Sequence, residues 1–268
     1  MRLISHPILC NYYVTYRCNA RCSFCDIWER PSPYVDLHSA EQNLTALKEL
    51  GVKVIDFTGG EPLLHREIDR LLALAKELGF ITTLTTNCLL YPKWASKLKG
   101  KIDMLHFSLD APTEKEHNES RGVDCFEFVM KSIQVGKELG ERPDIIFTVF
   151  ENNVDQIEAV YHEICLPNDL VLILNPAFDY NDVDTGTVMS VETLHQLSKW
   201  GKKSGVYLNE GFIQLRKDGG NHVSNPVCKA ASSTIVISPN NELVLPCYHL
   251  GIKKFPISNN LAHLYRSD

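Results

Sequence analysis

Apolar residues recur with a helical period in five segments of the chain, and each of these segments is followed by a glycine. In one segment, Ile68, Leu71, Leu72, Ala75 and Leu78 fall on a single face, while charged residues occupy the other. Glycine just past a helix favours the left-handed conformation that closes a helix C-terminus. The pattern therefore predicts helices over Ser39–Leu50, Glu67–Leu78, Pro92–Lys99, Phe126–Leu139 and Val191–Ser204, ended by Gly51, Gly79, Gly100, Gly140 and Gly205.

Short apolar runs separate the predicted helices and predict strands, because they are rich in β-branched and aromatic residues. Strands that alternate with helices indicate an α/β fold with a parallel sheet. The periodicity leaves open whether this sheet is doubly wound and open or forms a partial barrel. In both architectures functional side chains gather at the carboxyl ends of the strands. The predicted strands are Asn11–Tyr16, Val52–Phe57, Phe80–Thr85, Met104–Leu109, Ile145–Phe150 and Leu170–Leu174.

Three cysteines, Cys18, Cys22 and Cys25, follow the first predicted strand. Three thiolates on one loop can bind one metal centre together. Structural zinc sites and closed iron–sulfur clusters usually have four protein ligands, whereas three ligands leave a coordination position open for a reactant. The spacing alone leaves open a zinc site that is completed by Cys10 or by a histidine.

The CxxxCxxC pattern, with the aromatic Phe24 before its last cysteine, resembles the radical S-adenosylmethionine (radical SAM) superfamily. The resemblance implies a partial (β/α)6 barrel. It implies a [4Fe–4S] cluster bound by Cys18, Cys22 and Cys25, with its fourth iron chelated by the amino and carboxylate groups of SAM. It further implies that a reductant such as flavodoxin or ferredoxin supplies an electron, and that SAM is cleaved to a 5′-deoxyadenosyl radical.

The sequence Gly59-Gly60-Glu61-Pro62 follows the second predicted strand. Two glycines allow a ligand to approach the backbone, a glutamate can accept hydrogen bonds from an ammonium group, and proline suits the first turn of a helix. By itself this sequence is typical of a tight strand-to-helix turn. One β/α unit after the three cysteines it resembles the Gly-Gly-Glu motif of the radical SAM family, which implies that it holds the SAM amino group.

Polar residues also follow the later predicted strands. The resemblance implies that Ser108 contacts SAM and that Arg121 pairs with the SAM carboxylate through a charge-assisted contact. Asp110 alternates with Ser108 and points to the same side, so it is a further candidate for cofactor binding. A lone arginine is otherwise more often a surface salt-bridge partner. Further candidates for cofactor binding, with helix capping or another structural role as the alternative, are Thr86, Asn87, Thr148 and Asn175.

The C-terminal stretch departs from this alternation, because two apolar runs around a Ser-Pro-Asn-Asn turn predict a β-hairpin over Thr234–Ile237 and Glu242–Cys247. With Cys228 and Cys247 beside it, the hairpin resembles the start of a SPASM or Twitch extension and implies an auxiliary iron–sulfur cluster. The family's glycine before the second cysteine is missing and no cysteine follows Cys247, so an extension that only caps the barrel is the alternative. We expect a core domain over 1–206 and an extension over 207–268, whose helical start at 259–265 is compatible with a longer native chain.

Composition narrows the classes of partner. The 268 residues carry a net charge of −6 and no basic block, which disfavours nucleic acid as a main partner. No apolar run reaches membrane-spanning length and the N-terminus is too short and broken for a secretory signal, so a cytoplasmic protein without a membrane span is expected. Nine cysteines at irregular spacing argue against a disulfide framework. Buried free thiols are expected at Cys10, Cys88, Cys125 and Cys165.

The resemblance implies that the enzyme takes a hydrogen atom from an unactivated C–H bond of a small-molecule biosynthetic intermediate. We expect an oxidation to follow, as a dehydrogenation or a hydroxylation. A tetrapyrrole such as a bacteriochlorophyllide, or an isoprenoid, is the first candidate substrate. The alternatives are a maturase of a peptide natural product, an iron–sulfur electron-transfer or scaffold protein that does not cleave SAM, and a zinc-binding module.

Overall fold

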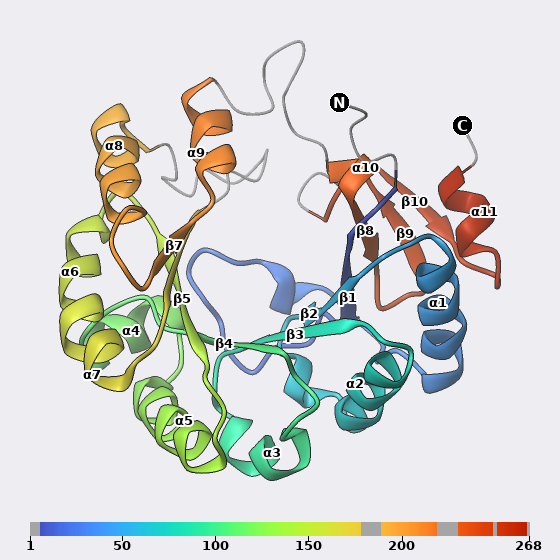
Figure 1. Ribbon diagram of the computed structural model, residues 1–268, viewed down its shortest axis with the longest axis horizontal. Helices are drawn as coiled ribbons and strands as arrows, with labels where there is room; N and C mark the ends of the chain where they lie inside the picture. Colours follow the sequence, from blue (N-terminus) through green and yellow to red (C-terminus); the bar gives the residue numbers. More distant parts are fainter. Residues whose placement is uncertain (1–5, 178–188, 219–229, 249–250, 267–268) are drawn as a thin grey trace.

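The computed structural model describes residues 6–177, 189–218, 230–248 and 251–266, and its strands form one curved sheet (Figure 1). The strand order is β10-β9-β8-β1-β2-β3-β4-β5-β6-β7, so β7 and β10 are the edges and the barrel is not closed. All neighbours from β1 to β7 are parallel. The strands are β1 (Leu9–Thr15), β2 (Val54–Gly59), β3 (Ile81–Thr86), β4 (Met104–Ser108), β5 (Asp144–Val149), β6 (Leu172–Pro176), β7 (Val206–Leu208), β8 (Thr234–Ile237), β9 (Glu242–Leu245) and β10 (Lys253–Pro256).

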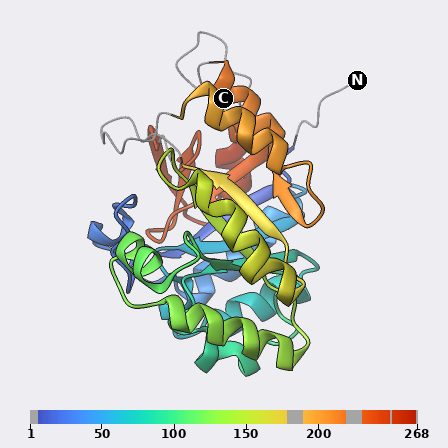
Figure 2. The ribbon, with the colours of Figure 1, turned by 90° about the vertical axis from the view of Figure 1, so that its left-hand side faces the viewer.

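Helices cover the outer side of the curved sheet, and the other side encloses the interior of a partial barrel (Figures 1 and 2). The predicted α/β fold and partial barrel are therefore confirmed. The helices are α1 (Leu37–Glu49), α2 (Ile68–Glu77), α3 (Tyr91–Leu98), α4 (Glu114–Arg121), α5 (Phe126–Leu139), α6 (Ile157–Ala159), α7 (Leu166–Asn168), α8 (Val191–Trp200), α9 (Glu210–Lys217), α10 (Ala230–Ser233) and α11 (Leu261–Arg266), with short turns η1 (Ile27–Glu29), η2 (Pro62–Leu64), η3 (Val154–Gln156) and the π-helical η4 (Val160–Cys165).

The observed helix boundaries agree with the predicted ones for the helices that have a clear apolar face. Gly140 ends α5 in the left-handed conformation with φ 78°, as expected. Helix α8 ends at Trp200, before the predicted Ser204, because the poor helix former Gly201 follows it. Helix α4 was not predicted, since its sequence is almost entirely polar and it buries only His117 and Arg121.

Strand residues alternate between the two sides of the sheet. Those that face the helices join the main apolar core, for example Phe57 in β2, Phe107 in β4 and Phe147 in β5. The residues between them face the barrel interior and are mainly polar. This division leaves the interior side of the sheet available for functional groups.

The predicted hairpin is present as β8 and β9, which pair antiparallel through Ile237 and Leu243. Its placement was not predicted: β8 pairs in parallel with β1, so the C-terminal stretch extends the main sheet. The proposed domain boundary at residue 206 falls within β7 (Val206–Leu208). No helix of the described residues is long and apolar enough to span a membrane.

Candidate functional site

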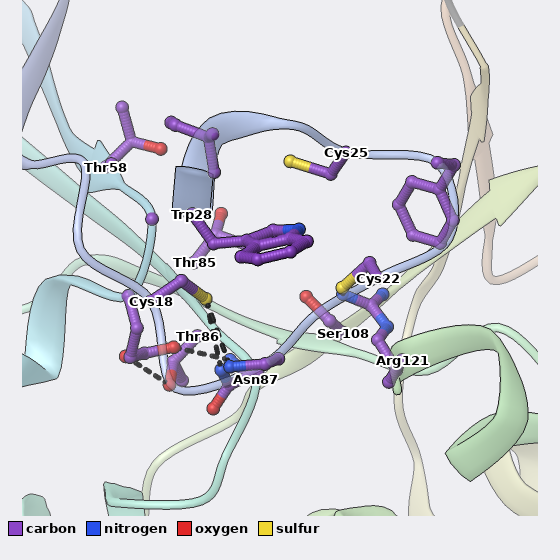
Figure 3. Close-up of a pocket in the computed structure, with 16 residues that line it drawn as sticks. Cys18, Cys22, Cys25, Trp28, Thr58, Thr85, Thr86, Asn87, Ser108 and Arg121 are labelled. Carbon is purple, nitrogen blue, oxygen red and sulfur yellow. Dashed lines mark hydrogen bonds between the residues drawn. The ribbon is translucent and has the colours of Figure 1, made fainter. Parts of the chain in front are cut away.

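A cavity of about 140 Å³ lies at the carboxyl ends of β1 to β4 (Figure 3). The residues that line it include most of those predicted from the sequence to bind the cluster or the cofactor. Eleven lining residues are predicted cluster or cofactor residues: Cys18, Cys22, Phe24, Cys25, Gly59, Gly60, Glu61, Thr86, Asn87, Ser108 and Arg121. Five others were not selected: Ala20, Ile27, Trp28, Thr58 and Thr85.

The cysteine loop is held against the C-terminal end of α4. The backbone N–H groups of Arg21 and Ser23 donate to the carbonyl oxygens of Arg121 and Ser120, both at 3.0 Å. Gly122 closes α4 with φ 62°, and a Cβ there would lie 2.4 Å from the Arg21 carbonyl oxygen. Two loops that are a hundred residues apart in sequence thus form one wall of the cavity.

The three cysteine thiols are free, partly buried and turned toward the cavity (Figure 3). Burial raises the pKa of Cys18 to about 12 and also raises the pKa of Cys25. Within the described ranges, no three Cys, His, Asp or Glu side chains converge on a position for a single ion. The thiols instead surround a space, an arrangement that suits a cluster in which each thiolate binds a different iron.

The two glycines of the second motif bring β2 into backbone contact with the start of the cysteine loop. Gly60 N–H donates to the Thr15 carbonyl oxygen, and Glu61 N–H donates to that of Arg17, both at 2.9 Å. A Cβ on Gly59, whose φ is 151°, would lie 2.1 Å from the Thr15 oxygen, and a Cβ on Gly60 would lie 2.3 Å from the Arg17 oxygen. Glycine is therefore required here by the chain's own backbone.

Glu61 is fully buried, and its carboxylate joins the ends of β2 and β3. Its Oε1 accepts hydrogen bonds from Leu63 N–H at 3.0 Å and from the Thr86 hydroxyl at 2.9 Å, and its Oε2 accepts from Asn87 N–H at 2.9 Å. Burial raises the pKa of Glu61 to about 7, against the lowering effect of these donors. The side chain thus has three partners within the protein itself.

Asn87 links this turn to the cysteine loop. Its Nδ2 donates to Asn19 Oδ1 at 2.8 Å and lies 3.9 Å from Cys18 Sγ, while its Oδ1 accepts from Leu89 N–H at 3.2 Å. The N-cap of α3 is Leu90 and has no side-chain hydrogen bond. Thr86 and Asn87 therefore position the cavity wall and do not cap α3, the alternative that the sequence had left open.

Asp110 and Arg121 form a buried ion pair, with Arg121 Nε 2.6 Å from Asp110 Oδ2. Asp110 raises the pKa of Arg121 against the lowering effect of burial. The guanidinium carbon lies 5.4 Å from the Phe24 ring centroid, and Nη1 lies 3.9 Å from Cys22 Sγ. Arg121 is thus not a surface salt-bridge partner: it is a fixed charge beside the thiols.

Five predicted residues of the described ranges lie outside the cavity lining, and one of them is Asp110, which pairs with Arg121 behind it. Thr148 contacts Asp110 through its backbone N–H at 2.9 Å, and the exposed Asn175 is its neighbour across β5 and β6. Pro62 is buried at the start of η2. Cys247 is partly buried next to Tyr248, whose ring stacks on Tyr13 at 4.4 Å.

Cys228 lies outside the described residues, so the auxiliary cluster stays a prediction. The four remaining cysteines, Cys10, Cys88, Cys125 and Cys165, are all buried.

Sequence reasoning missed a second polar layer in the barrel interior. Thr58, Thr85 and Ser108 line the cavity. The residues two positions before them are Asp56, Thr83 and His106, respectively, and they face the same side of the sheet. Thr83 donates its hydroxyl to Asp56 Oδ1 at 2.6 Å, and His106 Nδ1 lies 3.4 Å from Asp144 Oδ2. The period-2 alternation of polar residues in these runs was a signal that could have identified this layer.

The contact between β2 and the cysteine loop can be tested with Gly59→Ala. We expect a loss of more than about 3 kcal/mol in the free energy of unfolding, because the new Cβ would overlap the Thr15 carbonyl oxygen. Urea denaturation measures the loss. Gly79→Ala is the matched control, since Gly79 also has a positive φ of 85° but no atom within 4 Å of its Cβ; a cost of about 1–2 kcal/mol is expected there. Equal losses in both variants would contradict the steric argument.

The role of Glu61 can be tested with Glu61→Gln at about pH 8.5, above the raised pKa. An amide offers one acceptor and one donor, so either Asn87 N–H or the Leu63 and Thr86 pair loses its acceptor. We expect destabilisation by about 1–3 kcal/mol without any cofactor present. Glu77→Gln on the exposed end of α2 should change stability by less than about 0.5 kcal/mol. A Glu61→Gln protein as stable as this control would show that the carboxylate does not hold the turn.

Comparison with known proteins supports the resemblance seen in the motifs. Residues 12–164 match the radical SAM superfamily. An S-adenosylmethionine-dependent nucleotide dehydratase of a Thermoplasmatales archaeon (strain ISO4-H5) is 33% identical over 113 residues, which is 40% of this chain and only 39% of the relative. A probable GTP 3′,8-cyclase of Methanococcus maripaludis (strain C6) is 30% identical over 216 residues, which is 76% of this chain and 70% of the relative.

Among solved structures, SuiB of Streptococcus suis, bound to its precursor peptide SuiA, has the same fold. The TM-score is 0.79 at 21% identity, and the match covers 98% of this chain and 65% of that chain. The family match itself extends over more than half of this chain. This chain therefore belongs to the radical SAM superfamily, and its cofactors are a [4Fe–4S] cluster and S-adenosylmethionine.

Proposed function

We propose that Cys18, Cys22 and Cys25 bind the [4Fe–4S] cluster and that the enzyme takes a hydrogen atom from a polar substrate in the barrel interior. The observation that carries this proposal is that the three cysteines and residues at the ends of β2, β3 and β4 line one shared cavity. When bound, the reduced cluster cleaves SAM and supplies a 5′-deoxyadenosyl radical. An electron-transfer protein would not need this shared cavity.

The residues around the thiols suit this cofactor pair in charge and shape. Arg121 places a positive charge 3.9 Å from Cys22 Sγ, which suits a cavity that receives negatively charged groups. Asp110 fixes the guanidinium from behind, so its remaining N–H groups can meet a carboxylate. We propose that Arg121 binds the SAM carboxylate in this way.

We propose that Glu61 has a structural role in the site and does not bind SAM directly. Its carboxylate oxygens accept from Leu63, Thr86 and Asn87, so it holds the ends of β2 and β3 together beneath the cavity. The hydroxyl groups of Thr58, Thr85 and Ser108 line the cavity and can accept hydrogen bonds from the SAM amino group or ribose.

The second polar layer supports a polar substrate. Closed barrels usually fill their interior with branched apolar residues, whereas here Asp56, Thr83, His106 and Asp144 face it. The side chains of His106 and Asp144 are 14% and 26% exposed, so they can be reached from solution. These carboxylates favour a substrate that presents hydrogen-bond donors or positive charge, and they disfavour the apolar tetrapyrrole or isoprenoid expected from the sequence.

The comparisons point to two classes of polar substrate. The named relatives act on nucleotides, and SuiB binds a precursor peptide. A peptide segment fits the layer better than a triphosphate, because phosphates close to Asp56 and Asp144 would be repelled. The relatives are named as a dehydratase and a cyclase, which supports more than one kind of overall reaction. The proposal therefore stops at hydrogen abstraction, and oxidation is one of the outcomes that it allows.

The cluster ligands can be tested with Cys22→Ala after anaerobic reconstitution with iron and sulfide. We expect no 5′-deoxyadenosine from SAM and dithionite, because one iron loses its thiolate ligand. Mass spectrometry measures the product. Cys165→Ala removes a buried thiol in η4 that does not line the cavity, and it should keep both iron and activity. Product formation by Cys22→Ala at the wild-type level would refute the assignment, and an iron-loaded wild type without product would favour electron transfer.

The substrate layer can be tested with His106→Asn and Asp56→Asn. The enzymes are incubated with SAM, dithionite and an extract of the source cells grown in deuterated medium. We expect the deuterated fraction of 5′-deoxyadenosine to fall about tenfold, because substrate contacts worth 1–2 kcal/mol are lost. Asp169→Asn, on an exposed turn, should keep the wild-type fraction. An unchanged fraction in both interior variants would exclude this layer from substrate binding.

A further inference from the structure

Trp28 lies within the cavity although no motif marks it. It belongs to η1, the short turn that follows Cys25, and the neighbouring Ile27 is buried and anchors this turn. The indole ring lines the cavity together with the three cysteine side chains, and Figure 3 shows its nitrogen edge on the side of Cys22 and Cys25. The ring is therefore placed where a group bound by these thiols would meet it.

The indole Nε1 is inaccessible to solvent and has no hydrogen-bond partner among the residues that the structure describes. A buried indole N–H usually finds an acceptor, and leaving one without a partner costs about 1–3 kcal/mol. The ring is held from the side by Arg21, whose guanidinium carbon lies 5.4 Å from the ring centroid. The chain thus fixes a hydrogen-bond donor in the cavity and leaves its acceptor to be supplied.

Neutral thiols are weak acceptors, whereas thiolates and sulfides of an iron–sulfur cluster accept N–H hydrogen bonds. The cavity that Trp28 lines together with Cys18, Cys22 and Cys25 is where such sulfur would be supplied. An N–H···S hydrogen bond stabilises the more negative, reduced state of a cluster and raises its reduction potential.

We propose that Trp28 is a positioning residue of the cluster, whose indole N–H donates a hydrogen bond to cluster sulfur on the Cys22 and Cys25 side. The inference rests on the proposed cluster ligands. The hydrogen bond sets how readily the cluster accepts the electron that it passes to SAM. Trp28 would then act on the chemistry through the cluster, without contact with the reacting atoms.

The first test is Trp28→Phe in the full chain, which keeps an aromatic ring and removes the donor. Trp94→Phe, on α3 outside the cavity lining, is the matched control. After anaerobic reconstitution, iron content is measured first, and the midpoint potential of the cluster is then measured without SAM by a redox titration followed by electron paramagnetic resonance. We expect equal iron content in all three proteins and a more negative potential in Trp28→Phe alone. Equal potentials in the two variants would overturn the proposal.

The second test keeps Trp28 and so does not depend on the folding of its variant. The chain has three tryptophans, and Trp94→Phe with Trp200→Phe leaves Trp28 as the sole emitter. We expect cluster assembly to quench this emission almost completely, and to quench it far less in the matched protein that retains only Trp94. Weak quenching of Trp28 in an iron-loaded protein would overturn the proposal. A wild type that binds no iron would instead refute the proposed cluster ligands, so the two failures can be told apart.

Discussion

The site depends on the close contact between the end of β2 and the start of the cysteine loop. Two backbone hydrogen bonds and two glycines bring Gly59 and Gly60 against Thr15 and Arg17, at a separation that no Cβ could occupy. Because the cysteine loop leaves β1 at this point, the contact sets where all three thiols lie. The glycines that a motif search associates with a bound cofactor thus have a first role within the chain.

Polar groups buried behind the cavity then fix its walls. Asp110 pairs with Arg121 and accepts a hydrogen bond from Thr148 N–H, and His117 accepts one from Asp110 N–H at 3.2 Å through Nδ1. Removing one partner from such a network is costly, since an uncompensated charge would stay buried. The pair therefore stabilises the protein less by its own attraction than by allowing one orientation of the guanidinium beside Cys22.

Much of this fold could be predicted from local patterns. The spacing of apolar residues and the glycines that end helices depend only on residues close together in the sequence. The six strands, the helices with strong apolar faces and the C-terminal hairpin follow from them. Long-range pairings do not: nothing in Thr234–Ile237 indicates that β8 lies beside β1. Motif spacing located eleven cavity residues, but it could not show that Asp110 and Arg121 pair with each other or that Glu61 already has three donors.

The alternation of strand residues connects the two halves of the proposed chemistry. Thr58, Thr85 and Ser108 line the cofactor cavity, and Asp56, Thr83 and His106 lie one step further along the same strands on the same side. Consecutive residues on one side of a strand are about 7 Å apart, so a substrate that contacts the second layer lies directly beside a cofactor held by the first. Hydrogen-atom transfer requires contact between the reacting carbons, and a rigid sheet maintains that register better than loops would. The parallel strands of this partial barrel would thereby hold the proposed cofactor and the proposed substrate at a fixed separation.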